Sequence, residues 1–363
     1  MQLSYLAIGS FIFAAALMQG QPGGDPQFDR GLALFDRPFS LVEGLGAPAM
    51  NADSCRACHQ DPGIGGSGSL ELNVSLFGND NGGNGPFTKI PGGFTASKLF
   101  PPSVHGREEY PTGVSGADVF EQRQTPSLFG VGLIDQIPSA VITANEDVID
   151  ADGDGIFGFA RRLPVGVNVE IGRFGWKGQI PSVEDFVNDA MFNELGLTTP
   201  GDDRGFSVLA DADSVADPEI TEGQVDDITH FVNMLPRPQR GGSVDPQVAE
   251  GEVVFNEIGC AKCHTPSLAS PLGPVPLFSN LLLHNVMPAG FRGMAEPGAA
   301  AGFYRTPPLW GIKDTAPYMH DGRAEDLEGA ILAHFGEAEG VRAAFELLPS
   351  FPKKALLQFL RDL

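Results

Sequence analysis

All four cysteines of this 363-residue chain fall within two copies of one short motif, Cys-x-x-Cys-His, and no other feature restricts the fold as strongly. In this motif the two thiols bond to the vinyl groups of a haem, and the adjacent histidine binds the iron. Because each copy has its own histidine and no cysteine remains for a disulfide, two covalent haem c groups are favoured over a redox dithiol or a zinc site. The predicted attachment residues are Cys55, Cys58, Cys260 and Cys263, and the predicted axial ligands are His59 and His264.

Acidic residues outnumber basic ones, with 46 Asp and Glu against 23 Lys and Arg and a formal net charge of −23. Binding to nucleic acid needs clustered positive charge, so this composition excludes a basic nucleic-acid binder. With 42% hydrophobic residues the chain can bury a core, while 47 Gly and 30 Pro require many turns. We therefore predict a mainly α-helical protein with long irregular loops.

The first 20 residues predict export. Residues 3–18 are apolar and uncharged and are followed by a polar, turn-rich segment, which is typical of a secretory signal peptide cleaved near Gly20. The apolar stretch is shorter than the roughly 20 residues of a membrane-spanning helix. Cleavage would leave a periplasmic or extracellular protein with no membrane span. The alternatives are a retained N-terminal anchor and a buried helix.

Several motifs recur in the same order around the two cysteine motifs. Gly-x-x-x-Phe precedes each copy, at residues 31–35 and 251–255, and Thr-Pro-x-Leu-aromatic-Gly follows each, at 125–130 and 306–311. Gly and Phe four residues apart share one helix face, which suits a helix packed closely on another. The repeated order predicts two tandem cytochrome c-type domains that arose by duplication.

The predicted domains cover residues 25–240 and 243–363, and a Pro- and Gly-rich linker at 236–242 separates them. The first domain is larger because loops are inserted between its motifs. One of these, the Gly-rich segment 61–94, is predicted to be an irregular loop rather than a set of strands. An apolar helix closes each domain, with equivalent residues at one constant offset: Ile228, Phe231 and Leu235 in the first, and Leu356, Phe359 and Leu363 in the second.

An acidic segment begins at Asp150, where carboxylates alternate with small residues before a glycine. Alternating oxygens of this kind form the first half of an EF-hand calcium loop, although Arg161 stands where the bidentate Glu is usual. The alternative is a solvated acidic turn. The segment predicts calcium bound by Asp150, Asp152 and Asp154.

These blocks together resemble the bacterial di-haem cytochrome c peroxidases, and most closely the di-haem oxidoreductase family that is also labelled thiol oxidoreductase-like. The resemblance rests on residues 125–133, 150–155, 172–177, 281–284, 305–311 and 318–323. It implies that electrons enter at the C-terminal haem and are used at the N-terminal haem. Thiol oxidation has no support in the residues, because every cysteine is assigned to haem.

The resemblance also implies a sixth ligand for the C-terminal haem. In the peroxidases this ligand, often Met, lies about 14 residues after the histidine of an HDG-like motif, and counting from His320 reaches His334. A histidine here departs from the Met pattern and implies a lower reduction potential. Other candidates in the sequence are His284, Met287, Met319 and His320 itself.

Further roles carried over from the family are a structural or haem-tuning role for His320 and acid–base roles for Gln136 and Glu146. The backbone carbonyls of Thr315 and Pro317 would bind a calcium ion between the domains. His105 is the candidate distal ligand of the N-terminal haem, and its alternative role is as a solvent-exposed loop residue.

The sequence therefore predicts an exported di-haem c-type oxidoreductase of the peroxidase kind. Its expected partners are a small redox protein, such as a c-type cytochrome, as electron donor and hydrogen peroxide or another small oxidant. One alternative is a plain electron-transfer cytochrome with both haems six-coordinate. Another is a di-haem oxygenase or oxidase that acts on a macromolecule.

Overall fold

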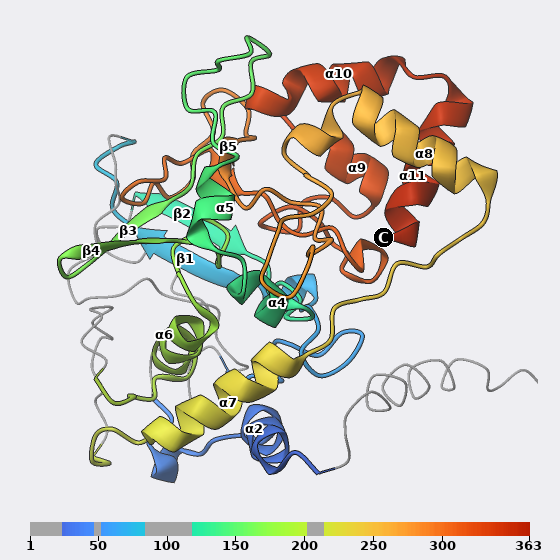
Figure 1. The fold of residues 1–363 in the computed structure, drawn as a ribbon. Helices are drawn as coiled ribbons and strands as arrows, with labels where there is room; N and C mark the ends of the chain where they lie inside the picture. The colour runs from blue at the N-terminus through green and yellow to red at the C-terminus, as the bar shows by residue number, and fades with distance from the viewer. Residues whose placement is uncertain (1–23, 47–51, 84–117, 202–213) are drawn as a thin grey trace, which may run out of the picture.

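The computed structural model describes residues 24–46, 52–83, 118–201 and 214–363 (Figure 1). The predicted signal peptide and His105 lie outside the described residues. Across the four described ranges, no helix is both long and apolar enough to cross a membrane.

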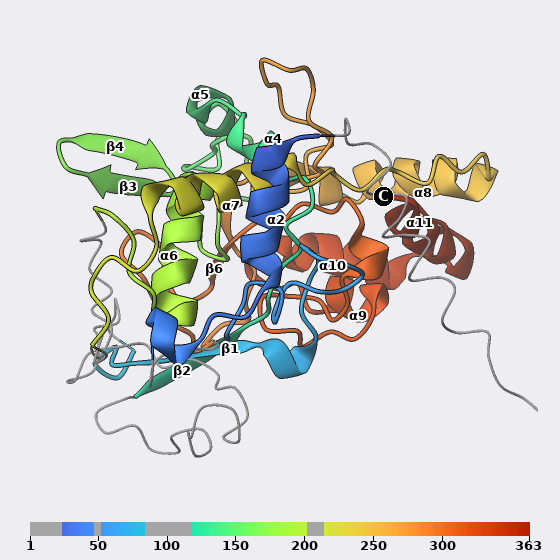
Figure 2. The ribbon, with the colours of Figure 1, turned by 90° about the horizontal axis from the view of Figure 1, so that it is seen from below.

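Two helix pairs organise the fold. Helix α2 (Pro26–Asp36) packs against α7 (Glu222–Met234), and α8 (Pro246–Glu257) packs against α11 (Ser350–Asp362). The first helix of each pair begins alike: an aspartate side chain caps it, and a proline follows where a missing N–H costs nothing. The two pairs lie on opposite sides of the molecule, joined by a segment without helix or strand (Figure 2).

Each pair is held together at a glycine. A Cβ on Gly31 would lie 2.0 Å from the carbonyl oxygen of Asp227, and a Cβ on Gly251 would lie 2.0 Å from that of Ala355. Only a residue without a side chain allows the two helix backbones to come this close. The close helix packing predicted from the Gly-x-x-x-Phe motifs is confirmed.

One further long helix, α6 (Val183–Leu195), packs against α7. The other helices are short and connect the loops around the centre of the molecule. They are α4 (Val131–Asp135), α5 (Ser139–Thr143), α9 (Leu327–Leu332) and α10 (Glu339–Leu347). Single 3₁₀ turns are η1 (Leu41–Glu43), η2 (Leu70–Leu72), η3 (Cys260–Lys262), η4 (Ile312–Asp314) and η5 (Gly336–Ala338).

The described strands form three separate antiparallel pairs. These are β1 (Val74–Gly78) with β2 (Val119–Arg123), β3 (Arg162–Val165) with β4 (Asn168–Ile171), and β5 (Leu283–Asn285) with β6 (Phe303–Arg305). Strand β1 corrects the prediction that segment 61–94 is irregular throughout. Its partner lies more than 40 residues away, and such a distant pairing leaves no local signal in a Gly-rich sequence.

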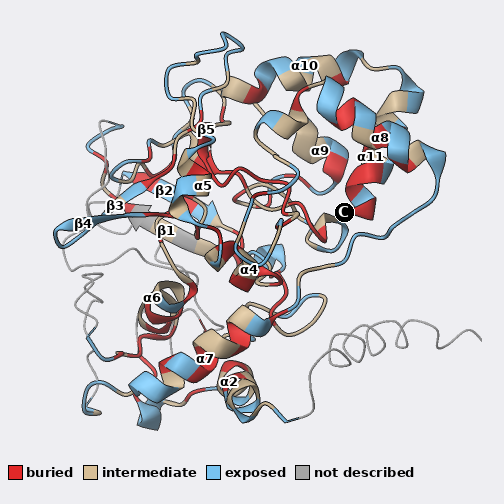
Figure 3. Cartoon of the chain, in the orientation of Figure 1, coloured by how far each residue is buried: buried red, intermediate tan, exposed pale blue. Residues whose placement is uncertain are grey.

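Two hydrophobic clusters fill the interior (Figure 3). The smaller cluster contains Phe255, Phe345 and Phe359 and lies within the second predicted domain. The larger cluster surrounds α2, α6 and α7 but also takes in Leu281 and Trp310 from the second predicted domain. The chain after the linker therefore contributes to both cores, and the two halves share buried surface.

Candidate haem-binding site

A cavity of about 900 Å³ lies between the two helix pairs, and both cysteine motifs line it. Its wall is largely apolar and includes Phe35 of α2, Ile228 of α7, Phe255 of α8 and Leu356 of α11. A cavity with this volume and lining is typical of a site that takes up a large, mostly apolar ligand.

The first motif folds as one tight turn. The backbone N–H of His59 donates to the carbonyl of Cys55 at 3.0 Å, which places the imidazole directly after the two thiols. Nδ1 of His59 lies 3.1 Å from the carbonyl oxygen of Gly66, and because a carbonyl only accepts, this nitrogen donates its proton. Nε2 is thereby left as the unprotonated nitrogen that can bind a metal. Burial lowers the pKa of His59 to about 4, which keeps the ring neutral.

The second motif repeats this arrangement. The N–H of His264 donates to the carbonyl of Cys260 at 2.9 Å, and Nδ1 donates to the carbonyl of Phe278 at 3.0 Å. Burial, together with the neighbouring His334, lowers the pKa of His264 to about 3. Both predicted axial ligands are therefore neutral and fixed in the same tautomer.

The thiols do not behave as metal ligands or redox groups. No disulfide joins any two of the four cysteines, which all lie in the described part of the chain. Burial raises the pKa of Cys55 and of Cys260 to about 12, so both stay protonated at neutral pH. Zinc binding and thiol–disulfide chemistry need a thiolate, whereas thioether attachment to haem leaves no charge to bury.

His334 lies opposite His264. Their ring centres are 6.5 Å apart, with planes inclined at 63°. Two imidazoles bonded to opposite sides of one metal at about 2 Å each have ring centres roughly 6 Å apart. Nδ1 of His334 donates to the carbonyl of Ala330 at 2.7 Å, so its Nε2 is the nitrogen left for a metal. The structure thus brings together the two histidines that counting along the sequence paired.

Of the other candidates for that ligand, His284 is already engaged. Its Nδ1 lies 2.9 Å from a carboxylate oxygen of Glu337 and its Nε2 lies 3.0 Å from the side-chain nitrogen of Asn280. Met287 and Met319 both line the cavity. The sulfur of Met287 accepts from Arg323 at 3.7 Å.

His320 lies in the cavity wall between the two motifs. Its ring stacks on Tyr304 with centres 3.9 Å apart and meets the edge of Trp176 at 6.5 Å. The side chain is buried, burial lowers its pKa to about 4, and Nδ1 has no hydrogen-bond partner. These contacts suit the predicted structural or haem-tuning role.

Arginines that the sequence analysis did not single out form one charged part of the wall. Glu296 accepts from Arg123 and from Arg161, each at 2.6 Å, and all three side chains are buried or nearly so. Arg305 is 8% exposed and donates only to backbone carbonyls of Gly175 and Thr306, with no carboxylate partner in the described residues. Burial lowers the pKa of Arg305 to about 10. A buried arginine without a counterion fits a ligand that carries carboxylates, as haem does.

The structure places the predicted acid–base pair outside the cavity. Gln136 is exposed at the end of α4, and Glu146 accepts from Arg162 and from the N–H of Ala160. Neither lines the cavity, so this geometry does not support the predicted catalytic role. Counting from Thr125 failed because the intervening segment forms α4 and α5 on the surface. Polar side chains reach the cavity from α6 instead: Asp189, Asn193 and Glu194.

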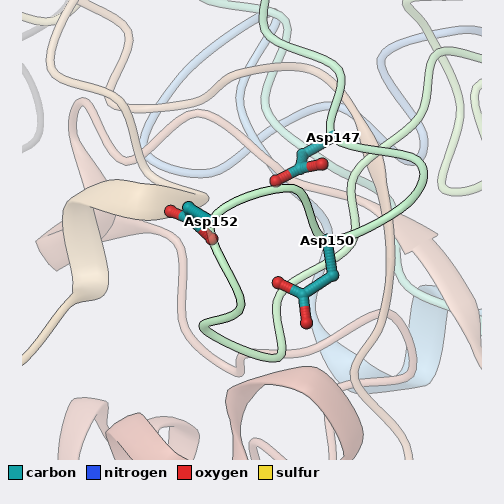
Figure 4. A group of neighbouring side chains, drawn as sticks. All are labelled: Asp147, Asp150 and Asp152. Atoms are coloured by element: carbon teal, nitrogen blue, oxygen red, sulfur yellow. The ribbon is translucent and has the colours of Figure 1, made fainter.

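The acidic loop gathers a different set of carboxylates from the predicted one. Asp147, Asp150 and Asp152 bring oxygens within 4.8 Å of one another around the loop (Figure 4). Asp154 instead forms an ion pair with Lys262, between the two cysteines of the second motif. Asp147 precedes the alternating pattern and so gave no signal in the sequence.

Thr315 lines the cavity, and Pro317 lies beside it next to a second hollow. Asn73 approaches this segment from the first half of the chain. Its side-chain N–H₂ donates to the carbonyl of Asp321 at 2.9 Å, while its Oδ1 is buried without a partner. An unpaired buried oxygen of this kind is a position where a cation or a water is expected.

A family model described as "Di-haem oxidoreductase, putative peroxidase" matches residues 114–363, which include the second cysteine motif. Among solved structures, the diheme peroxidase BthA from Burkholderia thailandensis E264 is 16% identical, with 94% of this chain and 86% of that chain covered and a TM-score of 0.47. A MauG-like protein associated with microbial copper homeostasis is 18% identical, with 94% and 89% covered and a TM-score of 0.43. Kuenenia stuttgartiensis hydrazine synthase is 14% identical, with 94% and 95% covered and a TM-score of 0.43. No curated protein sequence matches the chain.

Proposed function

The chain belongs to the di-haem oxidoreductase family, and from this membership we propose that it is an exported di-haem c-type oxidoreductase with peroxidase-like activity. Electrons enter at the C-terminal haem and are used at the N-terminal haem. The observation that carries the proposal is an asymmetry between the sites. His334 lies opposite His264, whereas in the described residues the ring contact of His59 is with Phe35.

Haem supplies reversible one-electron chemistry at iron and, where one axial face stays open, a place for a small oxidant to react. The cysteine pairs would attach it, and His59 and His264 would bind it from one side. His334 would close the second face of the C-terminal site, which restricts that site to electron transfer. Arg305 would pair with a carboxylate edge of a bound haem, because its buried charge has no other counterion in the described residues.

Each half of the chain would be a cytochrome c-type unit. The matching cap, glycine contact and histidine hydrogen bond in the two halves support a duplication. Trp310, which belongs to the larger cluster, and the shared cavity suggest that the two units work as one body.

Calcium would stabilise the arrangement at two places. In the acidic loop, Asp147, Asp150 and Asp152 would supply the carboxylates, and the neighbouring Asp154 ties that loop to the second motif through Lys262. Near the cavity, the carbonyls of Thr315 and Pro317 would bind a second ion together with Oδ1 of Asn73. Both sites offer hard oxygen ligands, which calcium prefers.

The net charge of −23 suits encounter with a basic donor such as a small c-type cytochrome. The test is to mix the haem-loaded protein with a reduced small cytochrome and hydrogen peroxide. The proposal expects peroxide-dependent oxidation of two cytochromes for each peroxide, because reducing peroxide to water takes two electrons and two protons. If the cytochrome exchanges electrons with the protein but peroxide has no effect, the chain is a plain electron-transfer cytochrome. Peroxide consumption without cytochrome oxidation would point to another reductant, such as a macromolecule.

A further inference from the structure

The segments around α6 and α9 are structural counterparts. An isolated β-bridge joins Phe174 to Ile180 before α6, and another joins Tyr318 to Ala324 before α9. Ser182 then caps α6 by accepting from the N–H of Asp185, and Asp326 caps α9 by accepting from the N–H of Gly329. Every residue of the second set lies 144 positions after its counterpart in the first.

The two helices also turn the same face to the cavity. Val183, Phe186, Val187 and Ala190 line it from α6, and the residues 144 positions later, Leu327, Ala330, Ile331 and His334, line it from α9 and the turn after it. Trp176 and His320 are counterparts as well, and their rings touch where the two halves meet. The correspondence therefore holds in the chain, in the hydrogen bonds and in the orientation of the side chains.

At the position of His334, the first half carries Ala190. This alanine is half-buried and lines the cavity, but a methyl group offers nothing that can bind a metal. The end of α6 is tied to the first motif, because the carbonyl of Glu194 accepts from the N–H of Ala52, three residues before Cys55. Helix α6 thus stands to the first site as α9 stands to the second.

We propose that Ala190 determines which haem reacts: by standing where the second half has its ligand histidine, it leaves the face of the N-terminal haem opposite His59 open. This inference rests on the proposed function, and it names the residue that separates the reactive site from the electron-transfer site. Asp189 and Asn193, which flank Ala190 and are hydrogen-bonded to each other at 3.0 Å, border the open face.

The test uses the haem-loaded protein in the oxidised state and measures spin state by optical spectroscopy and cyanide bound per chain by titration. The wild type is expected to bind one cyanide. Ala190→His should bind none and convert the high-spin haem to low-spin, and His334→Ala should bind two. The double variant Ala190→His/His334→Ala should bind one again, now at the other haem.

Ala190→Val is the matched control, because it adds bulk without a ligand and should keep one high-spin haem. Ala190→Met provides a second ligating variant if the histidine variant does not retain its haem. If the wild type binds one cyanide but neither ligating variant loses it, Ala190 does not face the open side, and the inference is wrong while the proposed function stands. If the wild type itself has two low-spin haems and binds no cyanide, the proposed function fails first.

Discussion

His264 and His334 face each other with ring centres 6.5 Å apart, each with Nδ1 held by a backbone carbonyl. One histidine belongs to the cysteine motif and the other follows α9, so the second site is assembled from segments 70 residues apart. Because the hydrogen bonds fix both tautomers before any metal binds, the pair is prepared for a metal between the rings.

The first prediction concerns the reduction potential of that site. His334→Met should raise the potential of the C-terminal haem, on the order of 0.1 V, because a thioether stabilises ferrous iron more than an imidazole does. Potentiometric titration followed optically measures it. His230→Gln is the control, since His230 pairs with Asp25 on the other side of the molecule. Equal shifts in both variants would rule out His334 as a ligand.

The second prediction concerns the helix pairs. Gly31→Ala and Gly251→Ala should each destabilise the protein by roughly 1–3 kcal/mol, because the added Cβ would lie 2.0 Å from a backbone oxygen of the partner helix. Gly223→Ala in α7 is the matched control. A Cβ there meets nothing within 4 Å, so this variant should gain about 0.5–1 kcal/mol. Urea unfolding measures all three, and a loss of stability in the control equal to the others would contradict the packing argument.

The third prediction concerns Glu296. Although burial alone would raise its pKa, Arg123 and Arg161 outweigh burial and hold the pKa at about 2, below the ordinary value of 4.5. A lowered folded-state pKa means that the stabilisation is complete above pH 4.5 and is lost as the pH falls toward 2. Glu296→Gln should therefore cost roughly 3–5 kcal/mol at neutral pH, because it leaves two buried arginines unpaired.

The gap between wild type and Glu296→Gln should narrow as the pH drops below 4.5. Unfolding by urea at several pH values, followed by circular dichroism, measures the gap. The exposed Glu170→Gln variant is the control and should follow the wild type throughout. A gap that stays constant down to pH 3 would show that the ion pairs do not set the stability.

The fourth prediction concerns the acidic loop. Asp152→Asn should weaken calcium binding by at least about tenfold, because it removes one of three converging carboxylates. Asp154→Asn should change the affinity little, since that carboxylate pairs with Lys262. Calorimetric titration of chelator-treated protein compares them. Equal weakening in both variants would restore the ligand set predicted from sequence.

The sequence was most informative where function requires a fixed local pattern. The two cysteine motifs, the capped helices and the Gly-x-x-x-Phe contacts are set within a few residues of each other, so spacing alone located them. His334 was found because its distance from His320 is constant within the resembled family. Membership of that family is confirmed.

Features that depend on distant contacts could not be predicted. Strand β1 needs β2, Glu296 needs Arg123 from 173 residues away, and Arg305 is notable only because folding buries it without a counterion. The predicted Gln136 and Glu146 were misplaced for the same reason, since no local pattern says which loop faces the cavity. Ala190 had no signal of its own, and it became visible only when the two halves were compared in three dimensions.

The central claim is that the two haem sites differ, one closed by His334 and one open beside Ala190. Electron paramagnetic resonance of the oxidised, haem-loaded protein tests it most directly. The account predicts one high-spin signal that peroxide alters and one low-spin signal typical of two histidine ligands. Two low-spin signals that peroxide leaves unchanged would contradict it.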